Sequence, residues 1–353
     1  MNDNNEAKMI KKLMKKDFNK LGITLLMQEL IANVVVFVAA ILIMIMQMLK
    51  DPNISIDKVM QTFKEASFGT ISIIAVVLAF IPFLIYRGKK FFKYDLKVEN
   101  KKFTLKIVII SFIIIFSVNN ILCLFADGLE YGLNAIGLSA NSALEDLEIL
   151  NQSTVSMIMY SCIIGPVFEE FVYRGAILRG LEKYGKKFAI LVSSILFGLM
   201  HGNFYQVFMA IGVGIIFGYL ATEYSIKITI LLHICNNICV QLMSQITSHF
   251  GENIGNIINM SMIVISLIIL VIAFIRNKKY IREWLQNNRM EKGIMLRCVT
   301  SITITLVIII DLLILASGIT TIKKEKSIDN HENEIETAYG SINEEKDMGN
   351  CYN

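Results

Sequence analysis

Long apolar segments recur along the whole chain of 353 residues and constrain its fold more than any other feature. A helix of about 20 apolar residues crosses the hydrocarbon core of a bilayer. By that criterion nine segments are candidate spans, approximately at residues 23–48, 68–86, 107–126, 154–178, 188–200, 204–222, 228–246, 254–275 and 298–317. The fifth is short and the sixth is rich in glycine and alanine, so either could be tilted or re-entrant. The sequence therefore predicts an all-α polytopic membrane protein with about eight to nine transmembrane helices.

Lys and Arg residues concentrate in alternate loops. Residues 8–20, 87–106, 179–187 and 276–297 are basic, whereas residues 127–153 contain five acidic residues and no Lys or Arg. Loops retained in the cytoplasm are enriched in Lys and Arg. We therefore expect a multi-pass protein of the cell membrane with a cytoplasmic N-terminus and an external C-terminal tail. These loops account for the net charge of +4, so we expect the lipid bilayer, and no nucleic acid, as a partner.

The apolar segments divide the chain into five regions. We expect a basic cytoplasmic segment at 1–22, transmembrane helices and loops at 23–153, a central region at 154–246, further transmembrane helices at 247–318 and an acidic tail at 319–353. The tail is polar and has no hydrophobic periodicity, which is typical of a disordered segment.

Adjacent carboxylates, Glu169 and Glu170, interrupt the fourth apolar segment and are followed by Tyr173 and Arg174. An unpaired charge at membrane depth costs several kcal/mol on insertion scales, so such residues mark candidate functional sites. At about 100° per residue Glu170 and Arg174 share a helix face, and their ion pair would offset the desolvation of both groups. Glu169 then has no local counter-charge and is suited to accept a proton from water. The alternative, that both glutamates only hold helices together, stays open.

Two histidines, His201 and His233, lie at later apolar segments, each one helical turn from another notable side chain. His233 and Asn237 share a helix face, so their donors could converge on one developing negative charge, as in an oxyanion hole. Phe197 precedes His201 by one turn and is more often a packing residue. Tyr173 could donate a hydrogen bond to a catalytic group, although packing is again the commoner role.

These residues form three motifs that resemble those of the CPBP family, the CAAX prenyl endopeptidases and bacteriocin-processing membrane proteases (Abi-type). The motifs are Gly165-Pro166-Val167-Phe168-Glu169-Glu170-Phe171-Val172-Tyr173-Arg174-Gly175, then Phe197 with His201, then His233 with Asn237. The run from Gly214 to Gly218 also resembles the glycine helix that the family places between its second and third motifs. One departure is Ile228, in a region where the family often has proline.

The resemblance implies an intramembrane endopeptidase with a four-helix catalytic core at residues 154–246 that encloses a polar cavity. It implies that Glu169 and His201 activate the attacking water, and that His233 and Asn237 stabilise the oxyanion. Glu170 would assist them, with Arg174, Tyr173 and Phe197 in support. The substrate would be a peptide or protein near the membrane, such as a peptide precursor, a lipid-modified tail or a bacteriocin leader.

The cofactor and the function class leave alternatives open. Glu169, His201 and His233 could bind zinc or another divalent metal beside an open position, and a metal-free mechanism fits the same residues. A non-catalytic membrane scaffold or bacteriocin-immunity protein is one alternative function. A proton-coupled transporter is another, although no inverted sequence repeat is evident.

Overall fold

The computed structural model describes residues 3–142 and 154–321. Within these residues the elements in chain order are α1 (Asp3–Lys50), α2 (Ile56–Thr62), η1 (Phe63–Ser67), α3 (Phe68–Ala79), α4 (Ile81–Arg87), η2 (Phe91–Asp95), α5 (Leu105–Ala135), β1 (Leu138–Ser139), α7 (Val155–Met159), η3 (Tyr160–Ile164), α8 (Gly165–Glu170), η4 (Phe171–Leu178), α9 (Arg179–Leu181), η5 (Glu182–Tyr184), α10 (Lys186–Leu199), α11 (Phe204–Glu223), α12 (Ile226–Phe250), α13 (Glu252–Asn287), α14 (Ile294–Val299), α15 (Ile302–Ser317) and β2 (Thr320–Thr321).

The protein is an all-α polytopic membrane protein, as predicted. Seven of the predicted segments form helices, or runs of consecutive helices, that are long and apolar enough to cross a membrane in the described part of the chain. The other two form α10 and α15, of 14 and 16 residues. At 1.5 Å per residue these helices are about 21 and 24 Å long, less than the hydrocarbon core of about 30 Å. The helix α10 is therefore too short to cross the hydrocarbon core by itself.

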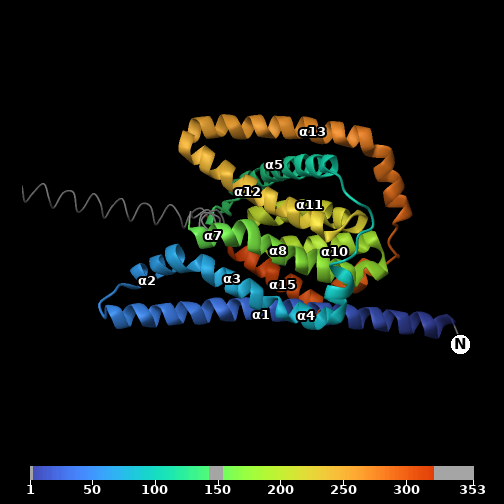
Figure 1. Cartoon of the computed structure of the whole chain (residues 1–353), viewed down its shortest axis with the longest axis horizontal. Coiled ribbons are helices and arrows are strands. Elements are labelled where there is room, and N and C mark those ends of the chain that lie inside the picture. The colour runs from blue at the N-terminus through green and yellow to red at the C-terminus, as the bar shows by residue number, and fades with distance from the viewer. Residues whose placement is uncertain (1–2, 143–153, 322–353) are drawn as a thin grey trace, which may run out of the picture.

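The helices pack in layers around the segment that carries the first motif (Figure 1). On one side of α8 and α10 lie α15, α3 and α1, and α1 packs directly on α3 and α15. On the other side α11 packs on α10, followed by α5 and α12, and α13 covers these two helices. The central helices are thus enclosed by protein, which allows polar side chains to lie between them.

Glycines let the central helices approach closely. A Cβ added at Gly214 of α11 would lie 3.2 Å from side-chain atoms of Arg174, Phe197 and Ser194. One added at Gly218 would lie 3.0 Å from Ile190 of α10. The predicted small-residue face of the run from Gly214 to Gly218 is therefore the surface that packs on α10 and on the first motif.

The segment of the first motif is not a regular α-helix. The π-helical turns η3 and η4 flank the short helix α8, so the chain winds more widely before and after the two glutamates. A Cβ at Gly165 would lie 2.9 Å from the carbonyl oxygen of Tyr160, which explains why a residue without a side chain occupies this junction. Single π-helical turns inside α-helices occur frequently at functional sites.

Several predicted boundaries differ from the structure. Residues 3–22 of the basic segment are continuous with the first span, because α1 runs unbroken over 48 residues. The second span is divided into α3 and α4, with Pro82 in the first turn of α4, where its missing N–H needs no partner. The ninth is divided between α14 and α15. Thr320 and Thr321, assigned to the tail, form β2, and the remainder of the tail lies outside the described residues.

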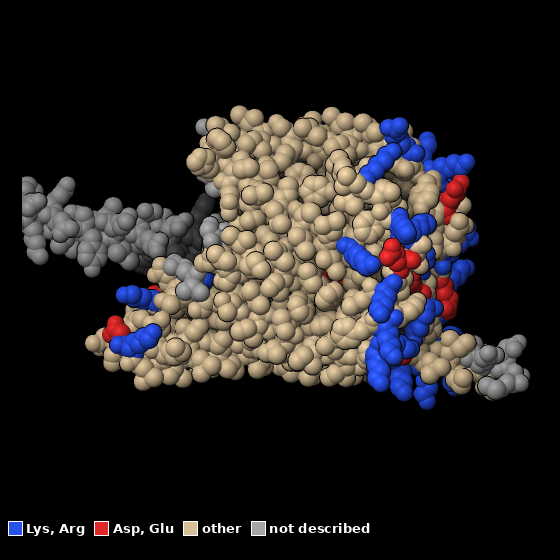
Figure 2. All heavy atoms as spheres, viewed as in Figure 1, with Lys and Arg blue, Asp and Glu red and all other residues tan. Residues whose placement is uncertain are grey.

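The two ends of the helical bundle differ in charge. Lys and Arg side chains gather over the end where α1 begins and α13 ends, and few lie over the remainder of the face in view (Figure 2). At the opposite end β2 pairs with β1 of the acidic loop, and Ser142 Oγ donates a hydrogen bond to Gly318 O at 2.7 Å. The loop and the start of the tail, both predicted to be external, therefore lie together.

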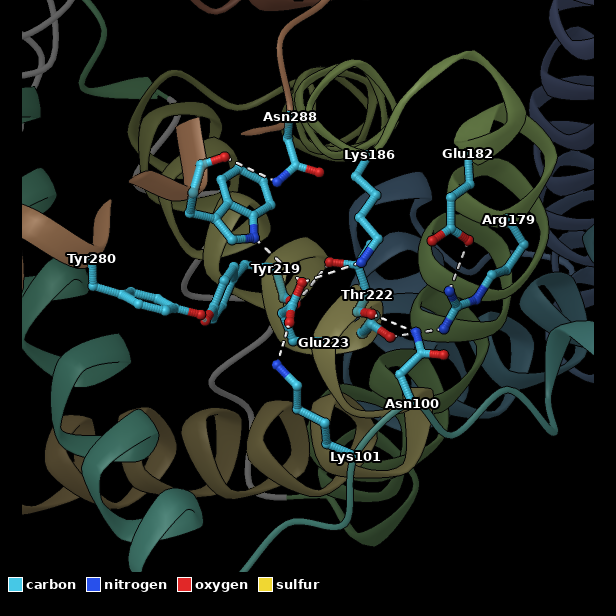
Figure 3. A network of polar contacts seen from close by, with 12 residues as sticks. Asn100, Lys101, Arg179, Glu182, Lys186, Tyr219, Thr222, Glu223, Tyr280 and Asn288 are labelled. Carbon is cyan, nitrogen blue, oxygen red and sulfur yellow. Dashed lines mark hydrogen bonds and ion pairs between the residues drawn. The ribbon is translucent and has the colours of Figure 1, made fainter. Parts of the chain in front are cut away.

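A polar network at the charged end joins α11 to neighbouring elements (Figure 3). The carboxylate of Glu223 lies 2.7 Å from Lys101 Nζ and 3.3 Å from Lys186 Nζ, and it accepts a hydrogen bond of 3.3 Å from Trp284 Nε1. The hydrogen bond to this carboxylate raises the pKa of Lys101, because the negative charge stabilises the ammonium group. Glu223 thereby connects α10, α11 and α13 with the loop before α5.

Replacing this carboxylate should destabilise the fold. We expect Glu223→Ala to lower the free energy of unfolding by about 1–3 kcal/mol, because it leaves the indole N–H and two ammonium groups without their acceptor. Thermal unfolding of purified protein measures the change. Glu283→Ala is the matched control, since Glu283 is exposed and lies 4.0 Å from Lys279; it should change stability by less than about 0.5 kcal/mol. Equal destabilisation by both variants would contradict this role of Glu223.

Candidate active site

A fully buried carboxylate, Glu170, holds two of the predicted site residues. Its Oε1 lies 3.0 Å from Arg174 Nη1 and 3.1 Å from His233 Nδ1. The side chains of Glu170 and Arg174 are both 0% exposed. The ion pair predicted from the spacing of these two residues is therefore confirmed, and the second partner, His233, comes from α12.

Aromatic rings and a backbone carbonyl enclose the guanidinium of Arg174. Its Cζ lies 4.3 Å from the ring centroid of Phe197 and 5.3 Å from that of Phe217. Its Nη2 donates a hydrogen bond of 3.3 Å to Gly214 O, an approach made possible by the absence of a side chain at Gly214. Cation–π contacts strengthen when the cation is desolvated. The charge of Arg174 is thus fixed between α10 and α11.

The imidazole of His233 lies between the two adjacent glutamates. Because the Glu170 carboxylate can only accept, His233 Nδ1–H donates to it, which fixes the orientation of the ring. The other nitrogen, Nε2, lies 3.6 Å from Glu169 Oε2. Phe217 contacts the same ring at a centroid distance of 5.0 Å. One histidine therefore links the buried carboxylate to its neighbour in sequence.

Glu169 has a different environment from Glu170. Its side chain is 21% exposed, and its ion-pair contact in the described residues is the one to His233 Nε2. Glu170, by contrast, is enclosed and neutralised by Arg174. Adjacent carboxyl groups placed in contrasting environments are a recurrent arrangement in enzymes that use one of them for proton transfer.

His201 lies in the turn that follows α10, at the end of the short helix. Its Nδ1 lies 2.8 Å from Phe197 O, and because a carbonyl accepts, Nδ1 is the donor. In the neutral ring this leaves Nε2 as a hydrogen-bond acceptor. His201 also interacts electrostatically with Glu169 and His233. The structure thus brings the second-motif histidine to the same region as the two glutamates.

Asn237 is held one turn after His233 on α12. Its Nδ2 donates to Ser161 O at 2.9 Å, and its Oδ1 accepts from Asn236 Nδ2 at 3.3 Å. Asn236 in turn accepts a hydrogen bond of 2.6 Å from Asn119 Nδ2 of α5. One N–H of the Asn237 amide therefore contacts the π-helical turn η3, and its second N–H is available for a ligand. A shared target of His233 and Asn237 stays a prediction.

The two aromatic residues proposed as supports connect the site. The ring of Phe197 contacts Tyr173, His201 and His233 at centroid distances of 5.2, 5.0 and 5.8 Å, in addition to Arg174. Packing by Phe197 therefore sets the positions of residues from three motifs. Tyr173 is 1% exposed and packs in the main core.

The side chains proposed as metal ligands do not match a metal centre. No group of three or more His, Cys, Asp or Glu side chains among the described residues is arranged to hold a metal ion. Both ring nitrogens of His233 face carboxylates, and Nδ1 of His201 is bonded to Phe197 O. We therefore derive no step through a metal.

Two further carboxylates, which the sequence analysis did not single out, lie near this site. Asp311 of α15 is 4% exposed, and Glu29 of α1 is half-buried. Tyr173 packs in one core cluster with Leu25 of α1 and with Ile304 and Val307 of α15, each about one turn or two from these carboxylates. Their position inside predicted apolar segments was the available indication, by the same argument that identified Glu169 and Glu170.

Comparisons with known proteins agree with the predicted resemblance. Residues 151–239 match the family model described as type II CAAX prenyl endopeptidase Rce1-like. A Bacillus subtilis (strain 168) protein named "Putative membrane peptidase YdiL" is 32% identical over 96 residues, which cover 27% of this chain and 39% of that relative. No solved structure matches significantly. The similarity to CAAX-type membrane proteases thus covers the segment of the three motifs, up to Cys239.

The ion pair of Glu170 with Arg174 allows stability and chemistry to be separated. Arg174→Ala should lower the free energy of unfolding by about 3–5 kcal/mol, because it leaves a buried carboxylate without its cation. The double variant Glu170→Leu/Arg174→Met should recover most of this loss, since apolar residues of similar size often replace a buried pair without cost. Thermal unfolding of all three proteins measures both effects. If Arg174→Ala unfolds like the wild type, the pair does not stabilise the fold.

Proposed function

We propose that this protein is an intramembrane endopeptidase of the CAAX type that hydrolyses a peptide bond of a membrane-proximal peptide or protein. The observation that carries the proposal is the arrangement of two adjacent glutamates on one histidine. Glu170 is buried, paired with Arg174 and bonded to His233 Nδ1, whereas Glu169 is partly exposed and faces His233 Nε2. The family match of residues 151–239 supports the same reaction class.

Glu169 acts as the general base in this proposal. Its carboxylate takes a proton from a water molecule, and the water oxygen attacks the carbonyl carbon of the scissile bond. His201 accepts a hydrogen bond from the same water through Nε2, because Nδ1 is engaged by Phe197 O. When the C–N bond breaks, the proton held by Glu169 passes to the leaving amine, so the reaction restores the carboxylate.

His233 and Asn237 stabilise the negative charge of the tetrahedral intermediate. Protonated His233 presents Nε2–H, and Asn237 presents its second amide N–H. Glu170 is a positioning residue that acts through His233: it accepts the hydrogen bond from Nδ1–H and so orients the ring. Arg174 neutralises Glu170 and so allows a carboxylate to remain ionised in a buried place.

We propose that the protein lies in the cell membrane with its N-terminus in the cytoplasm. The clustering of Lys and Arg at one end of the bundle supports this orientation (Figure 2). The substrate would be a peptide precursor, a lipid-modified tail or a bacteriocin leader. The scaffold, immunity and transporter alternatives predict no hydrolysis of a peptide bond, which makes cleavage the discriminating measurement.

Glu169→Gln should abolish hydrolysis, because an amide of the same size cannot accept the proton from water. We expect a loss of about 10²–10⁴-fold in cleavage rate with unchanged insertion and stability. Mass spectrometry of membrane-derived peptides from cells with the wild-type or variant protein identifies the substrate and measures its cleavage. Glu182→Gln is the matched control, since the Glu182 side chain is also 21% exposed and lies in an ion pair with the buried Arg179. Near-normal cleavage by Glu169→Gln would exclude Glu169 as the base.

Asn237→Ala should lower kcat by about 10²–10³-fold with little change in KM, because the proposed hydrogen bond forms mainly in the transition state. Steady-state kinetics with the substrate identified above measures both constants. Asn236→Ala is the neighbouring control: it loses the contact with Asn119, so it should reduce stability more than kcat. A fall in stability for Asn237→Ala with normal kcat in the folded fraction would assign Asn237 a packing role.

A further inference from the structure

Two unassigned carboxylates continue the buried faces of the helices that contain them. The buried residues of α1 that precede Glu29 follow one helical stripe: Met14, Phe18, Leu21 and Leu25. Those of α15 that precede Asp311 do the same: Ile304 and Val307. At these spacings both carboxylates point towards the protein rather than towards lipid. At each of these two positions the helical stripe of buried residues predicts an apolar side chain.

The packing of α1 on α15 brings the two carboxylates together. Thr303 Oγ1 donates a hydrogen bond of 2.8 Å to Asn19 O, and a Cβ at Gly22 would lie 2.3 Å from Thr303 Oγ1. The helices therefore touch at this level without an intervening side chain. Along α1, Glu29 lies seven residues after Gly22. Along α15, Asp311 lies eight residues after Thr303. Each carboxylate is therefore about two helical turns from the contact of Gly22 with Thr303. This register places the two carboxylates at a similar level of the contact between α1 and α15.

The pair lies beside the residues proposed for hydrolysis. Ile314, one turn after Asp311, packs so closely on the His201 turn that a Cβ at Gly202 would lie 2.7 Å from its Cγ2. Tyr173 is 1% exposed and packs in the same core cluster as Leu25 of α1 and Ile304 and Val307 of α15. No hydrogen bond joins its hydroxyl to another group within the described residues. Tyr173 is one helical turn, about 6 Å, from Glu169.

Neither carboxylate has a cationic partner within the described residues. Two other buried carboxylates have a cationic partner: Asp95 lies 2.6 Å from Arg87 Nη2, and Glu170 lies 3.0 Å from Arg174. A third, Glu130, accepts hydrogen bonds from Ser139 Oγ and Ala140 N. Two carboxylates at membrane depth carry a large desolvation penalty unless a cation joins them. The tyrosine hydroxyl beside them is a further polar group that lacks a partner. The three side chains form a polar site, and its two carboxylates are suited to bind a cation.

We propose that Glu29, Asp311 and the hydroxyl of Tyr173 form a subsite that binds a Lys or Arg side chain of the peptide substrate. This inference rests on the proposed endopeptidase function and adds the substrate class. An extended peptide advances about 3.3 Å per residue. The basic residue therefore lies within three residues of the scissile bond when that bond is next to Glu169 and His201. Binding it neutralises the carboxylates and sets the register of the peptide.

Mapped cleavage sites and matched peptides test the proposal. Sites cleaved by the wild-type protein and spared by Glu169→Gln are mapped first, and we expect Lys or Arg within three residues of each. Two peptides with the mapped sequence, one with the basic residue and one with Gln in its place, are then supplied to wild-type protein in liposomes. The basic peptide should have a kcat/KM about 10- to 100-fold higher, mainly through a lower KM, because a charge-assisted hydrogen bond is lost with Gln.

The variant Glu29→Gln/Asp311→Asn should remove this preference, so that the ratio of the two kcat/KM values falls to about one. Asp57→Asn is the control, since Asp57 is an exposed carboxylate in the first turn of α2. Equal cleavage of both peptides by the wild type overturns the subsite whatever the variants do. A double variant that keeps the preference, or that only loses thermal stability, overturns it as well. If Glu169→Gln changes no cleavage at all, it is the proposed function that fails.

Discussion

The buried negative charge of Glu170 is the constraint on which the rest of the site depends. A carboxylate with no exposed surface must be neutralised, and this requirement fixes Arg174 on one side and His233 on the other. Arg174 needs in turn a carbonyl and two aromatic faces, which come from α10 and α11 and require a glycine at position 214. The orientation of His233 towards Glu169 follows from the same charge. A single desolvated group thus organises side chains from four different elements.

Much of this arrangement could be predicted from the sequence because it depends on local spacing or on membrane energetics. The pair of Glu170 with Arg174 follows from helical geometry, and the contact of Phe197 with His201 follows from their separation by one turn. The apolar segments were recognisable because hydrocarbon tolerates only helices of a certain length and composition. The small-residue face from Gly214 to Gly218 was recognisable for a related reason, since close packing replaces the hydrophobic effect between membrane helices.

Other features depend on contacts between distant residues and have no local pattern. Asn237 of α12 and Ser161 of η3 are 76 residues apart in sequence, so their hydrogen bond could not be derived from local spacing. The proximity of Glu29 to Asp311 can be predicted only when α1 is known to pack on α15, and hydropathy does not show which helices pack together. The early end of α10, which places His201 in a turn rather than on a helix, depends on the fit of α10 against α11 and α15. Tertiary packing decided each of these cases.

The contact of α1 with α15 also bears on how the protein is made. Asn19 and Thr303, which join these helices by hydrogen bonds, are 284 residues apart in sequence. All the residues proposed for hydrolysis are synthesised between them, so their helices enter the membrane before α15 exists. Until then the His201 turn lacks Ile314, and Glu29 faces no second carboxylate. The side of the site formed by α15 is therefore completed last.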